Sequence, residues 1–335
     1  MLTRLRDHLL IADERAVFRA NPRGLGRALG LGQSEVLALL GCAAEERLVD
    51  LNWEIHCPKC QRDTCFAGQA QGASRPLSCR FCNHDYDLRI DHEVQLTFTV
   101  RPDLRSLSAK ADDADYRHRL DEANGPLNAL TLLNLPLFRE HFAATVLREG
   151  SSLRVRQLTI LATDLTNSTI FYSRDGDVMA YEIIRDHFRL MTALVETHSG
   201  FVLKTLGDGV LACFPETLSG LHAAVDIQRE MSAFWPKHSV RDNEAHVLRI
   251  GLHTGPSILV APAKQLDVFG ATVNIAFRVA RLARGGDILV TNTALDLDPA
   301  ARRELEALGP TETFQTVLKG FDEDCMIHRL ILPED

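Results

Sequence analysis

Two pairs of cysteines place the strongest constraint on what this chain can fold into. Cys57 and Cys60 form one Cys-x2-Cys pair, Cys79 and Cys82 form another, and 18 residues lie between the pairs. In a zinc ribbon, two tight turns each present a pair of thiolates, and one tetrahedral ion at about 2.3 Å from each sulfur joins the turns. A segment this small buries little apolar surface, so the metal would stabilise its fold directly. We therefore predict one structural Zn²⁺ bound by these four cysteines.

Other interpretations of these cysteines stay open. They could form a redox-active pair or be four unrelated buried thiols, and His56, Cys65 and His84 are close enough in sequence to be alternative ligands. A site closed by four thiolates has no open coordination position, so we assign no catalytic role to it. Four cysteines outside the pattern are interpreted as solitary thiols: Cys42, Cys65, Cys213 and Cys325.

The pattern of apolar residues divides the chain into four parts. Residues 1–52 alternate short helical patterns with glycines, an arrangement that resembles a helix-turn-helix or winged-helix unit. Residues 53–105 alternate apolar and polar residues as strands do, which predicts a β module around the cysteines. Residues 106–154 form an acidic linker and a short amphipathic helix, and residues 155–335 form the largest domain.

Charge and hydropathy exclude several kinds of partner. The chain has 335 residues, 37 of them basic and 45 acidic, and residues 1–52 carry 7 of each sign, which argues against a nucleic acid partner. No stretch of about 18 apolar residues without charge is present, which predicts that no segment spans a membrane. The first residues are interrupted by Asp7, His8 and Asp13, unlike a secretory leader. We expect a soluble cytoplasmic protein whose helical N-terminal part is an interaction or spacer module.

The last domain follows the order strand, helix, two strands, helix, strand. RQLTILATD indicates a buried strand, FVLKTL and VLACF are strands joined by a hairpin at Gly207-Asp208-Gly209, and VLRIGLHTG is a further strand. Before the hairpin, apolar residues recur at helical spacing and predict a helix, and a second helix is predicted after the hairpin. This βαββαβ order predicts an α+β fold, a ferredoxin-like sandwich with its helices on one face of the sheet.

Two carboxylates in this domain are candidates for metal binding. Asp164 ends the first buried strand, and Asp208 is at the tip of the hairpin, so the two can lie at one edge of the sheet. Mg²⁺ prefers a few carboxylate oxygens and fills its remaining positions with phosphate oxygens and water. The alternative is structural, since aspartates often form turns and cap helices.

Two further pairs have a spacing that suits a nucleotide. Lys204 precedes Asp208 by four residues on a strand, and Asp267 precedes a turn. A lysine donates and an aspartate accepts, which complements the acceptor and donor on the edge of adenine and mismatches guanine. Asn274 and Arg278 share one helix face at positions i and i+4, where Arg278 suits charge that develops on phosphate. The alternative for the first pair is a surface lysine and a loop aspartate without a shared role. The alternative for the second pair is a polar stripe of the helix that faces solvent.

Residues 155–331 resemble the catalytic domain of class III nucleotide cyclases. The resemblance rests on LTILATDLTNST, GFVLKTLGDGVLACF, RIGLHTGP, LDVFGATVNIAFRVARLA, GDILVTN and VLKGFDED, in the order and spacing of the family. Ala162, Ala271 and Phe277 depart from residues common in the family. Such a domain implies conversion of ATP to 3′,5′-cyclic AMP and pyrophosphate in a head-to-tail homodimer with shared sites. Guanylate cyclase activity, and a catalytically silent homologue that only senses nucleotides, stay as alternatives.

The resemblance also implies a role for each matching residue. Two Mg²⁺ or Mn²⁺ ions are expected on Asp164, Asp208 and the backbone carbonyl of Leu165. Lys204 and Asp267 match the pair that selects adenine, where guanylate cyclases typically carry Glu and Cys. The resemblance further implies that Asn274 and Arg278 stabilise the transition state and that Lys319 binds the triphosphate.

The N-terminal half is similar to a module found ahead of some bacterial cyclases. The similarity covers about residues 25–150 and is carried by LVDLNWEIHCPKC, CRFCNHDYDL, EVQLTFTVRPDLR and LPLFREHFAATVLREG. It implies a regulatory part made of a winged-helix-like piece and a zinc ribbon, with no defined function of its own.

Overall fold

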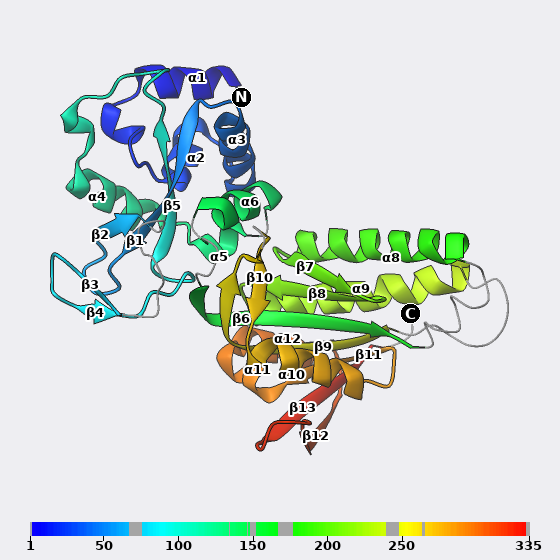
Figure 1. Cartoon of the computed structure of the whole chain (residues 1–335). Coiled ribbons are helices and arrows are strands. Elements are labelled where there is room, and N and C mark those ends of the chain that lie inside the picture. The colour runs from blue at the N-terminus through cyan, green and yellow to red at the C-terminus, as the bar shows by residue number, and fades with distance from the viewer. Residues whose placement is uncertain are drawn as a thin grey trace. The chain divides into compact units, whose positions relative to one another are not determined.

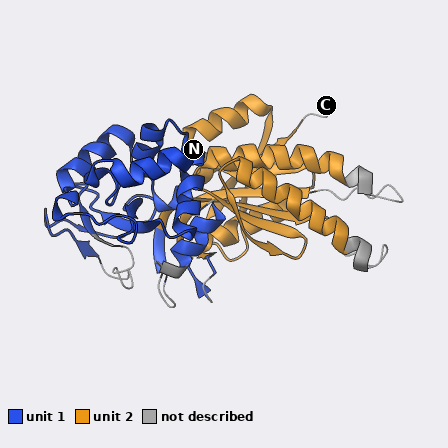
Figure 2. Ribbon diagram, turned by 90° about the horizontal axis from the view of Figure 1, so that it is seen from above, with its two compact units in different colours: residues 1–154, 260–266 blue, residues 155–259, 267–335 orange. Residues whose placement is uncertain are grey.

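The computed structural model divides into two compact units (Figure 2). Unit 1 comprises residues 1–154 and 260–266, and unit 2 comprises residues 155–259 and 267–335. The structure describes residues 2–66, 76–133, 135–145, 147, 152–166, 177–238, 248–262 and 265–332. Across these ranges, no helix combines the length and the apolar character that crossing a membrane requires.

Unit 1 begins with three helices, which confirms the helical N-terminal region. They are α1 (Leu2–Ile11), α2 (Pro22–Leu29) and α3 (Gln33–Glu45) (Figure 1). The start of α2 is fixed by Asn21, whose side chain accepts hydrogen bonds from the backbone N–H groups of Arg23 and Gly24. Its end is fixed by Gly30, which has a positive φ of 68°.

A three-stranded antiparallel sheet follows the helices of unit 1. Its strand order is β2 (Asp63–Phe66), β1 (Val49–His56) and β5 (Val94–Val100). The cysteine-bearing turns are inserted between β1 and β5, together with the short strands β3 (Leu77–Ser78) and β4 (Asp85–Tyr86). Strand β1 runs across the expected boundary between residues 52 and 53. The helical part and the cysteine-bearing part are therefore joined by one continuous strand of the sheet.

Helical segments complete unit 1 after β5. They are α4 (Ala114–Asn124), α5 (Ala129–Leu132) and α6 (Pro136–Thr145). Asp113 caps α4 by accepting a hydrogen bond from the backbone N–H of Tyr116, and Asn128 caps α5 through Thr131. The polar sequence around α4 therefore contains an ordered helix.

Unit 2 contains the predicted βαββαβ arrangement. Its elements are β6 (Ser152–Leu165), α8 (Asp177–Thr197), β7 (Phe201–Leu206), β8 (Gly209–Phe214), α9 (Thr217–His238) and β9 (Leu248–Val260). These strands lie in the order β9-β6-β8-β7, and β6 and β7 both pair antiparallel with β8. The α+β, ferredoxin-like fold is therefore confirmed.

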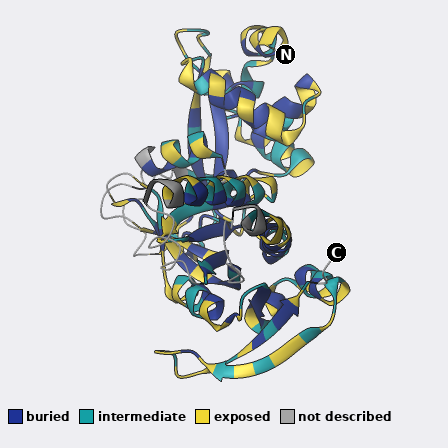
Figure 3. Ribbon diagram, turned by 90° about the vertical axis from the view of Figure 1, so that its right-hand side faces the viewer, coloured by how far each residue is buried: buried dark blue, intermediate teal, exposed yellow. Residues whose placement is uncertain are grey.

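The remaining elements extend the sheet. They are β10 (Asp267–Phe269), α10 (Ala271–Leu282), β11 (Asp287–Thr291), α11 (Asn292–Leu297), α12 (Pro299–Leu308), β12 (Thr311–Val317) and β13 (Asp324–Ile331). The complete order is β12-β13-β11-β9-β6-β8-β7, with β10 paired to β9. Every residue of the edge strand β12 is either exposed or half-buried (Figure 3).

Helices cover both faces of this sheet, so the expectation of helices on one face was wrong. On one face, α8, α9, α11 and α12 pack over a large cluster that includes Ile288 and Val290 of β11. On the other face, α10 packs over a smaller cluster that includes Leu289. Successive side chains of a strand point to opposite faces, so the apolar run in β11 was the sign of a strand buried on both sides.

A close backbone contact holds α10 against the sheet. A Cβ on Gly251 of β9 would overlap the backbone of Ala280 in α10, so only glycine allows the helix to approach this closely. The turn after α10 is held by Asp287, which accepts hydrogen bonds from the backbone N–H groups of Arg284 and Gly285. Asp287 also pairs with Arg329 of β13 at 3.0 Å, and both side chains are buried. These contacts position the helix that carries Asn274 and Arg278.

Candidate active site and metal centre

The four predicted cysteines converge in unit 1. Their sulfur atoms all lie within 4.8 Å of one another. The Sγ atoms of Cys57 and Cys82 are 3.7 Å apart, and those of Cys60 and Cys79 are 3.6 Å apart. These distances match the edges of a tetrahedron around one ion, so the four thiols fit a structural zinc.

The two Cys-x2-Cys turns have the same backbone hydrogen bonds. In each turn the first cysteine accepts a hydrogen bond at its carbonyl oxygen from the residue four positions later, Gln61 or Asn83. Those two residues have positive φ angles of 57° and 52°. In each turn a backbone N–H also donates to the sulfur of the first cysteine at 3.4 Å. The repeated geometry indicates two equivalent metal-binding turns.

The protonation of the thiols also favours a cation. Burial opposes ionisation of Cys79, but the backbone N–H groups of Phe81 and Cys82 lower its pKa to about 7. Burial and the neighbouring thiols raise the pKa of Cys82 to about 12, since adjacent thiolates repel one another. A divalent cation removes this repulsion and allows all four sulfurs to be thiolates.

The alternative ligands have other partners. The Nδ1 atom of His56 lies 3.0 Å from the carbonyl oxygen of Gln61, and its Nε2 atom lies 3.6 Å from Glu54. His84 stacks against Tyr86 with ring centroids 6.3 Å apart. The side chain of Cys65 lies outside the described residues. The solitary thiols whose side chains are described, Cys42, Cys213 and Cys325, are not members of the four-cysteine cluster.

In unit 2, a contact between β6 and the hairpin brings Asp164 and Asp208 to one edge of the sheet. The register pairs Ala162 with Leu211, which places Asp164 beside the start of β8. A Cβ on Gly209 would overlap the carbonyl oxygen of Thr163, so the hairpin approaches β6 only because residue 209 is glycine. The backbone N–H of Val210 also donates to Thr163 Oγ1 at 2.8 Å.

The two carboxylates have different surroundings. Oδ2 of Asp208 is buried and accepts no hydrogen bond from any described residue. Asp164 pairs with Arg249 of β9, with 3.3 Å between Nη1 and Oδ2. A buried carboxylate oxygen without a donor suits a cation. Leu165 is buried and is the last residue of β6, directly after Asp164.

Arg249 was missed by the sequence analysis. It lies in the strand motif RIGLHTG, which was used only to define the fold. Because β9 is the neighbour of β6 in the sheet, its side chain reaches Asp164 across 85 residues of sequence. The signal was the arginine at the start of a strand that is otherwise apolar.

Lys204 and Asp267 lie together and form an ion pair. Lys204 Nζ lies 2.7 Å and 2.8 Å from the two carboxylate oxygens of Asp267. The backbone N–H of Val268 also donates to Asp267 at 2.8 Å. The side chains of Lys204 and Asp267 are 39% and 19% exposed, so both are partly accessible to solvent.

Asn274, Arg278 and Lys319 lie where α10 approaches the segment between β12 and β13. Arg278 stands over the ring of Phe321, with 5.0 Å between the guanidinium carbon and the ring centroid. A Cβ on Gly320 would lie 3.2 Å from Arg278 Nη1, and that nitrogen is buried without a hydrogen-bond acceptor. Asn274 and Lys319 are exposed.

The predicted residues thus form three groups in unit 2. Asp164 and Asp208 form one, Lys204 and Asp267 the second, and the residues around Arg278 the third. Within the described ranges, no hydrogen bond or ion pair joins the acidic group to the other two. Their roles in binding or catalysis remain predictions.

Comparison with known families agrees with the resemblance seen in the sequence. Residues 151–317 match the family described as the adenylate and guanylate cyclase catalytic domain. Residues 4–119 match a family of unknown function (DUF5939). The first match confirms the class of the catalytic domain, and the four-cysteine cluster fits the predicted zinc ribbon.

Individual relatives share a limited part of the chain. A putative adenylate cyclase 3 of Rhizobium meliloti (strain 1021) is 30% identical over 141 residues, 42% of this chain and 23% of that protein. An adenylate cyclase of Anabaena cylindrica is 26% identical over 159 residues, 44% of this chain and 32% of the relative. The chain therefore covers between 23% and 32% of the length of these two relatives.

Solved structures resemble the catalytic part. The adenylyl cyclase CyaB from P. aeruginosa has a TM-score of 0.48 and 16% identity, covering 55% of this chain and 97% of that chain. The guanylyl cyclase Cya2 has a TM-score of 0.46 and 21% identity, covering 56% and 96%.

We predict that the purified chain carries about one zinc ion, because four thiolates complete a tetrahedral site. Cys79→Ser removes one thiolate and should reduce the zinc content toward zero. Metal content is measured by plasma mass spectrometry. Cys42→Ser is the control, since this exposed thiol is not in the cluster and its loss should leave the zinc content unchanged. Full zinc content in Cys79→Ser would contradict the assignment.

A second prediction compares the two glycines of the hairpin. Gly209→Ala should destabilise unit 2 by at least about 3 kcal/mol, because the added methyl group overlaps the backbone of Thr163. Gly207 has a positive φ of 63° and open space around it, so Gly207→Ala should cost only about 1 kcal/mol. Urea unfolding followed by fluorescence measures both. Equal effects of the two substitutions would argue against the close contact.

Proposed function

Residues 151–317 belong to the adenylate and guanylate cyclase catalytic domain, and from this we propose that the chain is an adenylate cyclase. It would convert ATP to 3′,5′-cyclic AMP and pyrophosphate. The observation that carries the choice of ATP is the bonded pair of Lys204 and Asp267. Relatives named adenylate cyclase support the same activity.

The Lys204 and Asp267 pair supports selection of adenine. Lys204 can donate to N1 of adenine, and Asp267 can accept from its 6-amino group. Guanine presents a donor and an acceptor in the reverse order, which leaves both side chains facing groups of their own kind. An unsatisfied polar group in a desolvated site costs about 1–3 kcal/mol, enough for substantial discrimination.

The acidic edge supports binding of metal and phosphate. Asp164, Asp208 and the backbone carbonyl of Leu165 would hold two Mg²⁺ or Mn²⁺ ions, and the open acceptor of Asp208 fits such a role. When bound, the ions supply charge neutralisation for the phosphates and activation of the ribose 3′-hydroxyl. Arg249 balances the charge of Asp164 in the free protein.

The residues around α10 support stabilisation of the reaction. Arg278 offers a buried N–H group without an acceptor, which could donate to the α-phosphate as negative charge builds up. Asn274, one helical turn earlier on the same face, would orient the ribose. Lys319 would hold the leaving pyrophosphate. Phe321 fixes the guanidinium of Arg278 by stacking under it.

We further infer a site shared by two chains. Among the described residues of one chain, no hydrogen bond or ion pair joins the acidic group to the Arg278 group, so a second copy would supply the missing half of each site. A head-to-tail pair related by a two-fold axis would create two equivalent sites. One chain would provide Asp164 and Asp208, and its partner the nucleotide-binding groups.

Product analysis tests the activity. The full chain with ATP and Mn²⁺ should give cyclic AMP and pyrophosphate, detected by chromatography, with little product from GTP. Arg278→Ala should lower turnover by about 10²–10³-fold, because a donor to the transition state is lost. Arg281→Ala is the matched control, since Arg281 is exposed on the same helix.

The outcomes of that experiment distinguish the alternatives. Preference for GTP would establish a guanylate cyclase instead. Nucleotide binding without product from either substrate would identify a silent sensor. Unchanged turnover in Arg278→Ala would rule out the role given to this residue.

Mixing two inactive variants tests the shared site. Asp208→Ala and Asn274→Ala damage opposite halves, so their mixture should recover about a quarter of wild-type activity, since half of the dimers keep one intact site of two. Activity is measured after co-refolding or co-expression. A mixture of Asp164→Ala with Asp208→Ala should stay inactive, because both changes affect the same half. Inactivity of the first mixture would show that each chain forms its own site.

A further inference from the structure

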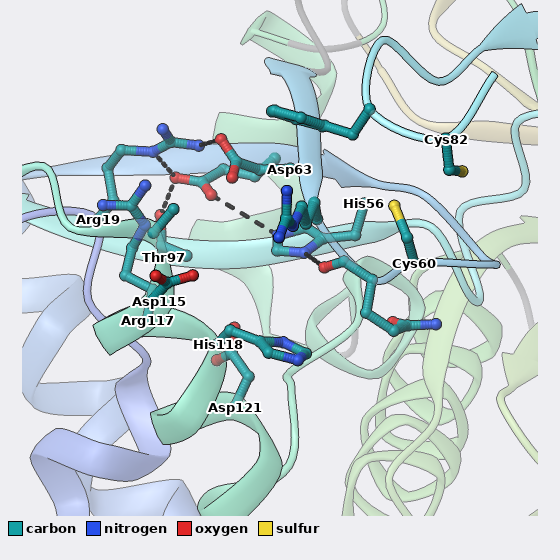
Figure 4. Close-up of a pocket in the computed structure, with 15 residues that line it drawn as sticks. Arg19, His56, Cys60, Asp63, Cys82, Thr97, Asp115, Arg117, His118 and Asp121 are labelled. Carbon is teal, nitrogen blue, oxygen red and sulfur yellow. Dashed lines mark hydrogen bonds and ion pairs between the residues drawn. The ribbon is translucent and has the colours of Figure 1, made fainter. Parts of the chain in front are cut away.

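Unit 1 contains a cavity that neither the zinc centre nor the cyclase activity explains. It lies between strands β1 and β2 and helix α4, has a volume of about 410 Å³, and reaches the turns that carry Cys60 and Cys82 (Figure 4). This volume is in the lower part of the range for small-molecule sites. Charged side chains dominate its lining, so the occupant must be polar.

The strand side of the cavity is a network of charges that satisfy one another. Arg19 donates to Glu54 at 2.6 Å and to Asp63 at 2.7 Å, and Thr97 donates to Glu54 at 2.7 Å. Glu54 is 1% exposed, and although burial opposes ionisation, the nearby His56 and the hydrogen bonds from Arg19 and Thr97 lower its pKa to about 2. The charges of this wall are therefore already paired.

The helix side contains a cation with an unused donor. Arg117 of α4 is 9% exposed, and its Nη2 atom pairs with Asp112 at 2.8 Å. Its Nη1 atom is buried and has no hydrogen-bond acceptor among the described residues. A buried guanidinium N–H without an acceptor is costly, and a carboxylate is the partner that it binds best. Arg117 also lines the cavity, so a small carboxylate bound there could pair with this guanidinium.

An unpaired carboxylate lies one helical turn away. Asp121 follows Arg117 by four residues, so both lie on the same face of α4, and Figure 4 shows Asp121 lining the cavity from this helix. Asn21 donates to Asp121 at 2.7 Å, which holds the side chain in place. Burial raises the pKa of Asp121; the hydrogen bond from Asn21 and the nearby His56 and His118 act in the opposite direction and offset only part of this rise. A ligand ammonium group would supply the missing positive charge.

We propose that this cavity binds a small zwitterion of the amino-acid class, with its carboxylate on Arg117 and its ammonium group on Asp121. Phosphorylated ligands fit less well, because a dianion would bind Arg117 but would be repelled by Asp121 and would leave that carboxylate without a cation. A purely cationic ligand would leave Arg117 Nη1 without an acceptor. Only a molecule with both charges satisfies both groups.

Calorimetric titration of the full, zinc-loaded chain tests the proposal. The probes are the twenty standard L-amino acids one at a time, with acetate, methylamine and inorganic phosphate as probes with a single kind of charge. At least one amino acid should bind one site with a Kd of about 1 mM or lower. The three other probes should bind at least tenfold more weakly.

Variants locate the site. Arg117→Lys keeps the charge beside Asp112 but loses the fork of N–H donors, and Asp121→Asn removes the charge that holds the ammonium. Each should weaken binding of the amino acid at least tenfold. Arg119→Gln is the control, because Arg119 is an exposed residue of the same helix and does not line the cavity. Zinc content and the unfolding temperature verify that each variant is folded.

Several results would overturn the proposal. They are the absence of binding by any amino acid, equal binding of acetate or phosphate, and equal loss of binding in Arg119→Gln. If Arg117→Lys does not fold, Asp121→Asn alone decides, since undiminished binding there removes the ammonium site. None of these readouts depends on cyclase turnover, so the result is independent of the proposed activity.

Discussion

The contact between Gly209 and the carbonyl of Thr163 is the constraint on which the acidic edge of unit 2 depends. It lets the hairpin lie directly on β6, so the residue after Thr163 and the residue before Gly209 are both aspartates at one edge. Any larger residue at position 209 would separate the two carboxylates. A comparable contact of Gly251 with Ala280 holds α10 on the face of the same sheet that lies opposite α8 and α9. The two glycines, which have no Cβ atom, thus determine the position of the acidic group and of the helix that carries Asn274 and Arg278.

Unit 1 is stabilised by different means. Its sheet has three strands, and two turns between β1 and β5 bring four sulfurs within 4.8 Å of one another. Beside them, charged groups pair in a buried network around Glu54. Unit 1 also buries large apolar side chains, among them Trp53, Phe98 and Phe142, so a metal on the four cysteines and the ionic network would add to an apolar core.

The sequence was informative where spacing alone determines geometry. The Cys-x2-Cys pairs, the glycines around Asp208 and the helical spacing of Asn274 and Arg278 are local patterns, and each predicted an element or a cluster that the structure contains. Contacts between distant residues were missed. Arg249 reaches Asp164 over 85 residues, and Arg19 reaches Glu54 over 35, so no periodicity reveals them. Residues 106–154 were interpreted as an acidic linker and a short amphipathic helix, and nothing in that polar sequence indicates that Arg117 is buried. The second helical layer was missed because an apolar strand does not show what covers each side.

The ion pair of Lys204 and Asp267 has a consequence for the unliganded protein. With each charge neutralised by the other, the groups that would recognise a base are masked until one arrives. An incoming adenine must separate them and replace their ionic contact with two hydrogen bonds between a charged side chain and an uncharged base. If a base cannot form both hydrogen bonds, the ion pair between Lys204 and Asp267 is more stable than the complex with that base. Rejection of the wrong nucleotide would then arise from the resting conformation itself, before any reacting atoms are aligned.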